Sequence, residues 1–443
     1  MCVNGLWAIL QTIRKARTHA ELCVHEGFML TGDTKRALTI GVDAEDLISV
    51  VKAQLRDTPH PTNGRNPVLK TLFYTLCHFG RIPAVLVFVF DGPHKSKKKN
   101  GAHVVQHELL LVDFFKDLID VFGFHHRQAS GDSKKELSDL QRLGRIDVIW
   151  TEDSGIWMYG ATQVVRRADE NTFYVYTAQE ISRCLQLSNE GMLLFALVIG
   201  GDHHEGLAGA DPQLAFTLAK SELSLELANI IATGWAVYNI RMRDWRQKLV
   251  NLLAAGALDQ RIVSLYAHAP SSIDFSEVYA FEQRPINVPG ILAQCVLRFG
   301  WDTYDRLYNL TVGKVWGAAC VRQLTEDNSG VESAARKNTA DFVVPGDAST
   351  VQRLFTTRAS GRLPLVMLRI DTSLFHLAVS GAISLFAMSY EQREDTVTLT
   401  VPLAIAEYAL PMHVSNFLQS ATGKRQMKKI GYDWLDEYDP VSP

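Results

Sequence analysis

The chain has 443 residues, of which 47% are hydrophobic and 21% charged, as in a globular protein large enough for two or three domains. Its formal net charge of −3 excludes a uniformly basic nucleic-acid-binding protein, so any nucleic-acid surface has to be a local patch. The six cysteines are scattered and form no C-x-x-C pair. This argues against a disulfide framework and structural zinc, and it favours a reducing compartment.

The sequence shows no sign of membrane association. Basic residues interrupt the amino-terminal segment early, so we expect no secretory signal there. The longest apolar run, residues 191–201, is about half of the ~20 residues that a bilayer-spanning helix needs. We expect this run to be a buried helix and the protein to be soluble and intracellular.

The first half of the chain alternates strand and helix patterns. Nearly continuous apolar, β-branched runs, typical of parallel strands buried on both faces, occur at residues 38–44, 84–92 and 145–153, with a fourth strand plausible at 171–178. Helical patterns follow the first run and precede the third, at residues 44–56 and 107–123. This order predicts an α/β fold with a parallel sheet and crossover connections.

A carboxylate stands at or near the carboxyl end of each of the three strong strands. These residues are Asp43, Asp91 and Asp153. Ligands of open parallel sheets bind at the carboxyl ends of the strands, so the three side chains are expected at one edge. The alternative is that each Asp serves as a turn or helix-capping residue.

The second half of the chain changes character. Residues 221–313 are mostly helical in pattern, and residues 325–350 are polar and Gly/Ser-rich, as in a linker. A smaller mixed unit follows, with strand-like runs at 363–371 and 395–402 and a helix-like run at 404–419. The basic segment 423–429 is expected to be exposed.

Five motifs together resemble the structure-specific 5′ nuclease family of flap endonucleases, XPG proteins and Holliday-junction resolvases, and most of all its resolvase branch. The motifs are "VNGLW", "GVDAEDLI", "FVFDGPHKSKKK", "GRIDVIWTEDSGIWMYGA" and "IGGDHHEGLAGADPQLAFTLA". The resemblance implies a PIN-like parallel-sheet nuclease domain, a helical helix–hairpin–helix extension and a small C-terminal α+β module that is similar to a chromodomain. The implied division is 1–105 and 106–205 (nuclease), 206–325 (helical extension), 326–349 (linker), 350–420 (module) and 421–443 (tail).

The resemblance also implies a two-metal active site for Mg²⁺ or Mn²⁺, with no small-molecule cofactor. Such sites hold two divalent ions ~4 Å apart between hard carboxylate oxygens. The residues that match the family's acids are Asp43, Asp91, Asp132, Asp153 and Asp202. In the family these acids are both the metal ligands and the catalytic residues.

Two positions depart from the family pattern. Lys134 and Gly155 stand where the family places metal-ligating acids. Gly155 offers no side-chain oxygen, and Lys134 would bring an ammonium group to the place of a metal ion. Impaired or absent catalysis follows, unless Glu136, Glu152 or Asp139 moves in to hold one metal ion.

The resemblance further implies two groups of DNA-binding residues. Gly206 and Gly209 correspond to the hairpin turn that approaches phosphates. Asp211 stands there where Gly is expected, which weakens that grip, although Asp211-Pro212 can equally cap a helix. His203 and His204 are expected to be structural. A basic run follows "FDGP" and is either a DNA contact, a solvated run or a nuclear localisation signal; it consists of Lys95, Lys97, Lys98 and Lys99.

The function that these observations predict is that of a divergent structure-specific nuclease in DNA repair, acting on flap or branched DNA in the nucleus. Resolvases act as dimers on junctions, so a homodimer on junction DNA is implied as well. The alternative function is a non-catalytic scaffold that keeps the PIN-like fold to bind nucleic acid or protein.

Overall fold

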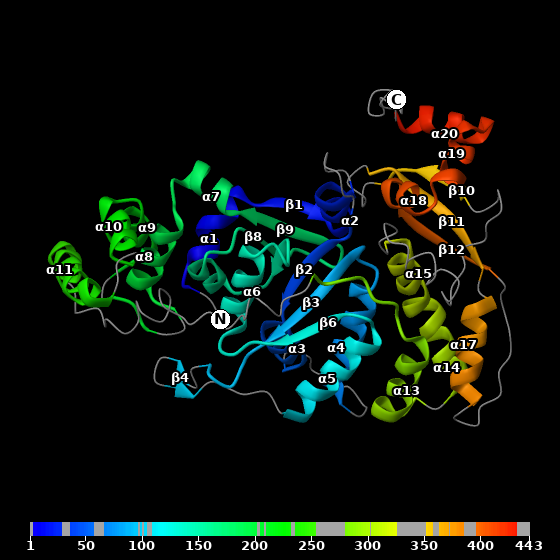
Figure 1. The fold of residues 1–443 in the computed structure, drawn as a ribbon, viewed down its shortest axis with the longest axis horizontal. Helices are drawn as coiled ribbons and strands as arrows, with labels where there is room; N and C mark the ends of the chain where they lie inside the picture. The colour runs from blue at the N-terminus through cyan, green and yellow to red at the C-terminus, as the bar shows by residue number, and fades with distance from the viewer. Residues whose placement is uncertain are drawn as a thin grey trace.

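The computed structural model shows an elongated protein built around one seven-stranded sheet (Figure 1). The helical lobe from α8 (Asn189–Ile199) to α11 (Trp235–Leu253) lies at one end of the molecule, and the C-terminal three-stranded sheet lies at the opposite end. The structure describes residues 3–28, 36–56, 66–95, 98–99, 102–103, 109–201, 204–207, 210–231, 235–253, 280–301, 303–325, 351–357, 363–371, 373–384 and 396–431.

The main sheet has the order β1-β9-β8-β7-β2-β3-β6. The five strands from β8 to β6 are parallel, whereas β9 and β1 extend the sheet in antiparallel pairings. The strands are β1 (Lys15–Thr18), β2 (Leu38–Asp43), β3 (Ala84–Phe90), β6 (His125–Gln128), β7 (Val148–Trp150), β8 (Gln163–Arg167) and β9 (Thr172–Thr177). A two-stranded ribbon, β4 (Lys98–Lys99) and β5 (Ala102–His103), lies outside this sheet.

The predicted parallel α/β core is confirmed, and all four expected strands are present. The predicted helices at 44–56 and 107–123 correspond to α3 and α5. Three strands of the main sheet, β1, β6 and β8, lay outside the expectation. Two of them have polar sequences, KART in β1 and HHRQ in β6, and only pairing with a neighbouring strand makes such segments extended.

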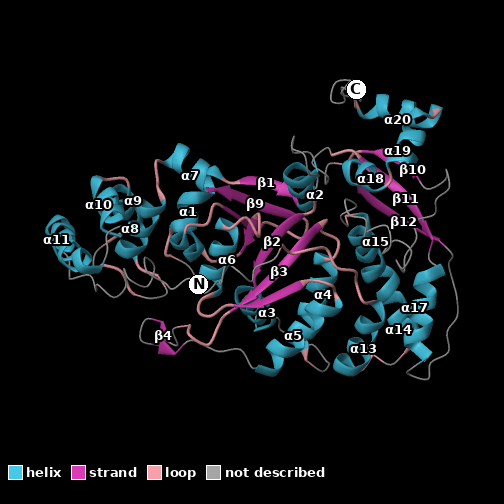
Figure 2. Cartoon of the chain, in the orientation of Figure 1, coloured by secondary structure: helices cyan, strands magenta, loops and turns pink. Residues whose placement is uncertain are grey.

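Helices cover both faces of the sheet (Figure 2). Alternate side chains of β3 enter two separate cores, with Leu86, Phe88 and Phe90 on one side and Val87 and Val89 on the other. The first core takes side chains from α2 (His19–Cys23), α3 (Ala44–Arg56), α4 (Pro67–Phe79) and α5 (Leu109–Val121). The second takes them from α1 (Leu6–Leu10), α6 (Ser133–Arg142), η3 (Ser154–Tyr159) and α7 (Ala178–Leu185).

The second core continues into a helical lobe. The lobe consists of α8 (Asn189–Ile199), α9 (Pro212–Ala219), α10 (Glu222–Ile231) and α11 (Trp235–Leu253). The predicted buried helix at residues 191–201 is α8, whose residues 191–198 are all buried. Among the helices that the structure describes, none has both the length and the apolar character needed to cross a bilayer.

The first core continues into the C-terminal half of the chain. Its helical part is α13 (Val288–Phe299), α14 (Tyr304–Leu310), η4 (Thr311–Trp316) and α15 (Gly317–Leu324). Arg322 of α15 is 2% exposed and donates hydrogen bonds to the carbonyl oxygens of Phe122, Gly123 and Arg284, at 2.7 to 3.0 Å. These bonds anchor α15 to the turn between α5 and β6.

The C-terminal unit has an antiparallel sheet with the order β10-β11-β12. Its elements are β10 (Val351–Phe355), β11 (Leu365–Asp371), α17 (Ser373–Ser384), β12 (Thr396–Pro402), α18 (Leu403–Ala409), α19 (Pro411–Gln419) and α20 (Ala421–Ile430). The expected strands at 363–371 and 395–402 are β11 and β12, and the expected helix at 404–419 is split at Leu410. The likeness to a chromodomain stays a prediction.

The expected domain boundaries fall differently on the observed elements. The boundary at residues 205/206 lies inside the hairpin between α8 and α9, which pack on each other. The basic segment 423–429 is part of α20, and the side chain of Gln426 accepts a hydrogen bond of 2.6 Å from the Leu354 N–H of β10. The tail therefore begins after α20. The expected linker lies outside the described residues.

Candidate active site

The carboxyl edge of the parallel strands carries a cluster of four carboxylates. Asp43 is the last residue of β2, and Asp91 follows β3 directly. Asp153 follows β7 as the N-cap of η3, and Asp132 follows β6 as the N-cap of α6. The prediction that strand ends bring Asp43, Asp91 and Asp153 to one edge agrees with the partners that they share, and Asp132 joins them there. We call these four residues, together with Lys95 and Lys134, the carboxylate–lysine cluster.

The first turn of α6 connects the carboxylates to one another. Ser133 donates from its backbone N–H to Asp91 Oδ1 at 3.0 Å and from its hydroxyl to Asp43 Oδ1 at 3.2 Å. The hydroxyl of Thr151, at the end of β7, donates to Asp43 Oδ2 at 3.2 Å. One helix start thus holds acids from two different strands in place.

Lys134 lies at the centre of the cluster and is only 6% exposed. Its Nζ is 3.1 Å from Asp153 Oδ2 and 3.5 Å from Asp132 Oδ1. Burial works to lower the pKa of a lysine, but Asp132, Asp153 and Asp43 outweigh it and raise the pKa of Lys134 well above its ordinary value. The side chain is therefore a permanent cation at neutral pH.

Lys95 is a second cation of the cluster. Its ammonium group pairs with Asp91 and lies 3.6 Å from Asp132 Oδ2, and the side chain is 15% exposed. Burial works against its charge, yet Asp132 and Asp91 raise its pKa above the ordinary value. Lys95 was expected in a DNA-contacting run, whereas the structure places it on the acids. Of the other lysines in that run, Lys97 lies outside the described residues, and only the backbone of Lys98 and Lys99 is described.

The pKa values of Asp43 and Asp153 shift in opposite directions. Burial raises the pKa of Asp43 to about 7, although Lys134 works in the other direction. Burial also acts to raise the pKa of Asp153, but Lys134 at 3.1 Å and the Gly155 N–H at 2.8 Å hold it below its ordinary value. The nearer carboxylate is thus the charged partner of Lys134.

Gly155 lies beside the tip of the Lys134 side chain. A Cβ at this position would be 3.1 Å from Asp153 Oδ1 and 3.8 Å from Lys134 Cε. An aspartate here would therefore start its side chain beside the Asp153 carboxylate and near Lys134. The two positions that depart from the family pattern thus meet in the structure, although they are 21 residues apart in the sequence.

The three acids that were considered as replacement ligands have other ion-pair partners. Glu136, 1% exposed, pairs with Arg127. The other pairs are Asp139 with Lys135 at 2.5 Å and with Arg142 at 2.8 Å, and Glu152 with Arg166 at 2.8 Å. None of these pairs includes a residue of the carboxylate–lysine cluster, so the described geometry does not support the rescue of a metal ion.

A two-metal centre can be tested against this donor set. Four carboxylates are the right chemistry for Mg²⁺ or Mn²⁺. However, an ammonium group cannot ligate a cation, and Lys134 already lies within 3.5 Å of two of the acids. The residues described here do not fit two divalent ions in their present arrangement. Asp202, the fifth expected ligand, lies outside the described residues.

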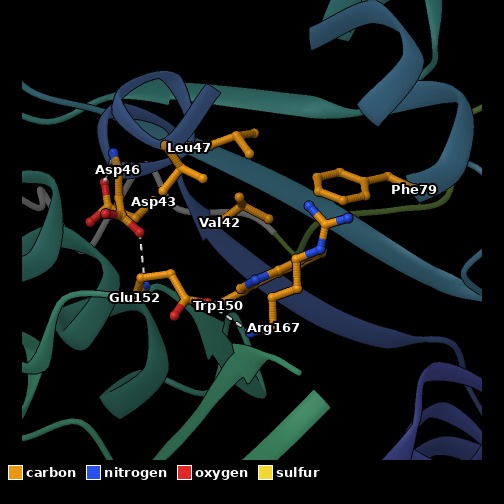
Figure 3. A pocket seen from close by; sticks show the side chains of 9 residues that line it. Val42, Asp43, Asp46, Leu47, Phe79, Trp150, Glu152 and Arg167 are labelled. Carbon is orange, nitrogen blue, oxygen red and sulfur yellow. Dashed lines mark hydrogen bonds between the residues drawn. The ribbon is translucent and has the colours of Figure 1, made fainter. Parts of the chain in front are cut away.

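A small pocket adjoins the cluster on the α3 side of the sheet (Figure 3). Its acidic side is formed by Asp43, Asp46 and Glu152, and Asp46 accepts a 2.8 Å hydrogen bond from the Glu152 N–H. The opposite side carries the rings of Phe79 and Trp150. Sequence reasoning missed Asp46, although its position three residues after Asp43 at a helix start could have indicated it.

The hairpin between α8 and α9 is a close backbone contact. Gly200 and Gly206 have φ angles of +87° and +83°, and a Cβ on Gly206 would lie 2.5 Å from the backbone of Ile199. The fold itself therefore requires Gly206, and a DNA contact there stays a prediction. Asp211 caps α9 by accepting from the Leu214 N–H at 2.8 Å, as the capping alternative predicts.

Other predicted residues of the hairpin are only partly described. His204 Nε2 lies 2.9 Å from the Leu197 carbonyl oxygen and is buried, which agrees with the expected structural role. Asp202, His203 and Gly209 lie outside the described residues.

Comparison with known proteins finds a family model and sequence relatives that match parts of this chain. Residues 123–202 match the XPG I-region. The DNA repair protein RAD2 of Saccharomyces cerevisiae is 25% identical over 127 residues, which are 28% of this chain and 12% of RAD2. Flap endonuclease GEN-like 1 of Oryza sativa is 26% identical over 239 residues, which are 46% of this chain and 38% of that protein. The chain thus spans well under half the length of these relatives.

Solved structures share the fold. A crystal structure of the Holliday junction-resolving enzyme GEN1 with product DNA and a Mg²⁺ ion has a TM-score of 0.69 at 18% identity, covering 95% of this chain and 99% of that chain. The catalytic core of Rad2 with a DNA substrate has a TM-score of 0.52 at 16% identity, covering 70% and 99%. Residues 123–202 are thus similar to the XPG I-region, and the chain shares the fold of the GEN1 and Rad2 nuclease structures.

Proposed function

We propose that this protein is a member of the structure-specific 5′ nuclease family. It binds flap or branched DNA, and its own metal-dependent hydrolysis is impaired or absent. The observation that carries the proposal is the position of Lys134, with Nζ 3.1 Å from Asp153 and 3.5 Å from Asp132. Gly155 supports it from the other side, because it brings no oxygen to the site.

The chemistry of the cluster supports the loss of catalysis. Two-metal hydrolysis needs an ion that lowers the pKa of the attacking water and an ion that stabilises the leaving oxygen. A protonated ammonium group does neither, and the raised pKa of Lys134 keeps it protonated, so it cannot act as a general base. The acids that remain are engaged by Lys134, Lys95 and the first turn of α6.

DNA binding is supported by the relatives and by local charge. The GEN1 and Rad2 structures contain DNA, and RAD2 is named a DNA repair protein. In this chain α20 exposes four cations, Lys424, Arg425, Lys428 and Lys429, while its Met427 and Ile430 pack against the first core. Such a face offers phosphate contacts in a protein whose overall charge is slightly negative. A role in DNA repair in the nucleus, and a homodimer on junctions, are part of this proposal.

The test is a cleavage assay on flap and four-way-junction DNA with Mg²⁺, Mn²⁺ or EDTA. We expect the wild type to bind these substrates without cutting them. The variant Lys134→Glu with Gly155→Asp restores both acids and is expected to gain divalent-cation-dependent cleavage. Lys135→Glu with Gly155→Asp is the matched control, because Lys135 neighbours Lys134 but pairs with Asp139 outside the cluster.

Two results would overturn the proposal. Robust cleavage by the wild type in Mg²⁺, absent in EDTA, would show that the lysines do not prevent catalysis. No detectable binding of flap or junction DNA would favour the alternative function, a non-catalytic scaffold for protein partners. The ion pairs of the cluster with Lys134 and Lys95 are compatible with this alternative as well, because a scaffold needs a stable fold and no metal ion.

A further inference from the structure

Each carboxylate of the cluster has an ion-pair or hydrogen-bond partner within the protein. Asp153 and Asp132 have Lys134, and Asp91 and Asp132 have Lys95. Asp43, 3% exposed, accepts hydrogen bonds from the hydroxyls of Ser133 and Thr151. Four acids from separate strands would repel one another in such a buried place, and the two ammonium groups offset that repulsion.

We infer that Lys134 is a built-in counter-cation that replaces a divalent ion, so that the fold needs no Mg²⁺ or Mn²⁺ at this site. The inference also assigns a latent metal site: removal of the Lys134 ammonium alone should turn the cluster into a divalent-cation-binding centre. It rests on the proposed function and deepens it, because it says what took the place of the metal and what would bring the metal back.

The position of Lys134 carries this inference. Its Nζ lies between acids of two different strand ends, which is where a bridging cation has to lie. Lys95 is closer to the surface, at 15% side-chain exposure against 8% for Lys134, and it serves Asp91. Without the Lys134 ammonium group, Asp132 would keep the backbone N–H of residue 134 and Lys95 at 3.6 Å, and Asp153 would keep the Gly155 N–H. Hard carboxylate oxygens facing a vacated space are suitable ligands for Mg²⁺ or Mn²⁺.

Gly155 also supports the role of Lys134 as a counter-cation. The space that its missing side chain leaves borders Lys134 Cε at 3.8 Å and Asp153 Oδ1 at 3.1 Å. An acid there would compete with Asp153 for the ammonium group, whereas glycine leaves the pair undisturbed. A Cβ at 3.1 Å would press on the Asp153 carboxylate, so the glycine leaves the Asp153–Lys134 pair undisturbed.

The experiment compares the melting temperature of three proteins in EDTA, in Mg²⁺ and in Mn²⁺. They are the wild type, Lys134→Met and Lys135→Met, the last being the matched control from the adjacent position. For the wild type and for Lys135→Met, we expect the melting temperature of each protein to be the same in all three buffers. Lys134→Met should melt lower in EDTA and recover by about 2 °C or more in Mn²⁺, because a ligand that binds only the folded state stabilises it.

Calorimetric titration with Mn²⁺ gives a second readout on the same proteins, and only Lys134→Met should bind. A wild type that is stabilised by Mn²⁺ as much as Lys134→Met would overturn the inference. So would a folded Lys134→Met that neither binds Mn²⁺ nor responds to it. If Lys134→Met folds only when Mn²⁺ is present, the inference holds.

If Lys134→Met folds in none of the three buffers, Lys134→Gln takes its place. The glutamine amide is uncharged but can donate a hydrogen bond to a carboxylate. Failure of both variants to fold with Mn²⁺ would contradict the latent site. The cleavage assay separates the two conclusions. A wild type that cuts DNA refutes the proposed function, whereas a non-cutting wild type with an unresponsive Lys134→Met refutes only the inference drawn here.

Discussion

Two neighbouring lysines of α6 have different ion-pair partners and therefore different roles. Lys134 faces the carboxyl edge of the sheet and shares Asp153 and Asp132, which come from different strand ends. Lys135, one residue later, faces away and pairs with Asp139 of its own helix at 2.5 Å. The first lysine holds the candidate site together, whereas the second belongs to a local i,i+4 pair. Residue type is the same, and only the direction of the side chain differs.

The largest expected effect is the difference in stability between Lys134→Met and Lys135→Met. Removing one partner of a buried ion pair costs about 3–5 kcal/mol, because it leaves a carboxylate buried without a counter-charge. Loss of Lys135 should cost less, because the buried Asp139 keeps a second cation, Arg142, at 2.8 Å. Urea unfolding monitored by tryptophan fluorescence measures both. Equal losses would mean that the two faces of α6 are energetically alike.

The next effect concerns a buried acid of α6 that lies outside the carboxylate–lysine cluster. Glu136 is 1% exposed and pairs with Arg127 of β6. We expect Glu136→Gln to lower the free energy of unfolding by about 1.5–3 kcal/mol, since Arg127 loses its buried charged partner and keeps only a neutral amide. Arg142→Gln is the control, because that side chain is 61% exposed. A negligible loss of stability for Glu136→Gln would mean that, of the two buried sites compared, only the carboxylate–lysine cluster depends strongly on its ion pairs.

A buried histidine that stays neutral extends the comparison to a group outside the cluster. Burial lowers the pKa of His19 to about 3, with His78 beside it acting in the same direction and Asp169 opposing. His19 is therefore neutral in the fold, and stability should be complete above its ordinary pKa of 6.5 and fall as the pH drops from 6.5 toward 3.

The measurement is urea unfolding at several pH values between 4 and 8. Each additional proton bound on unfolding contributes a slope of about 1.4 kcal/mol per pH unit. The slope of His19→Phe should be smaller by about that amount, and the remainder should come partly from His78, whose pKa burial also lowers. An unchanged slope would show that His19 does not set this pH dependence.

The smallest expected effect lies on α20, where lysines are exposed. If α20 contacts DNA phosphates, Lys428→Gln with Lys429→Gln should reduce the slope of log affinity against log salt by about 1 to 2. Lys248→Gln is the control, because Lys248 is exposed but paired with Glu226 at 2.9 Å. Fluorescence anisotropy with flap DNA at several salt concentrations gives the slopes. Identical slopes for all three proteins would exclude α20 from the interface.

Much of the fold could be read from apolar patterns. The strands β2 and β3 are buried on both faces, so their sequences are almost wholly apolar and their ends can be located, together with Asp43 and Asp91. The strand β6 could not be read, because HHRQ has no such pattern and is extended through its pairing with β3. Yet β6 leads to Asp132 and so positions one of the four acids.

By itself the sequence determined which acids end the strands and that Lys134 and Gly155 break the expected set of ligands. Only the tertiary structure decided what these residues contact. It placed Lys134 on Asp153 and Asp132, moved Lys95 from a presumed surface run onto Asp91, and tied Glu136 and Glu152 to arginines. The physical reason is that charge interactions depend on distance in space, and residues far apart in the chain become neighbours only when the strands pair.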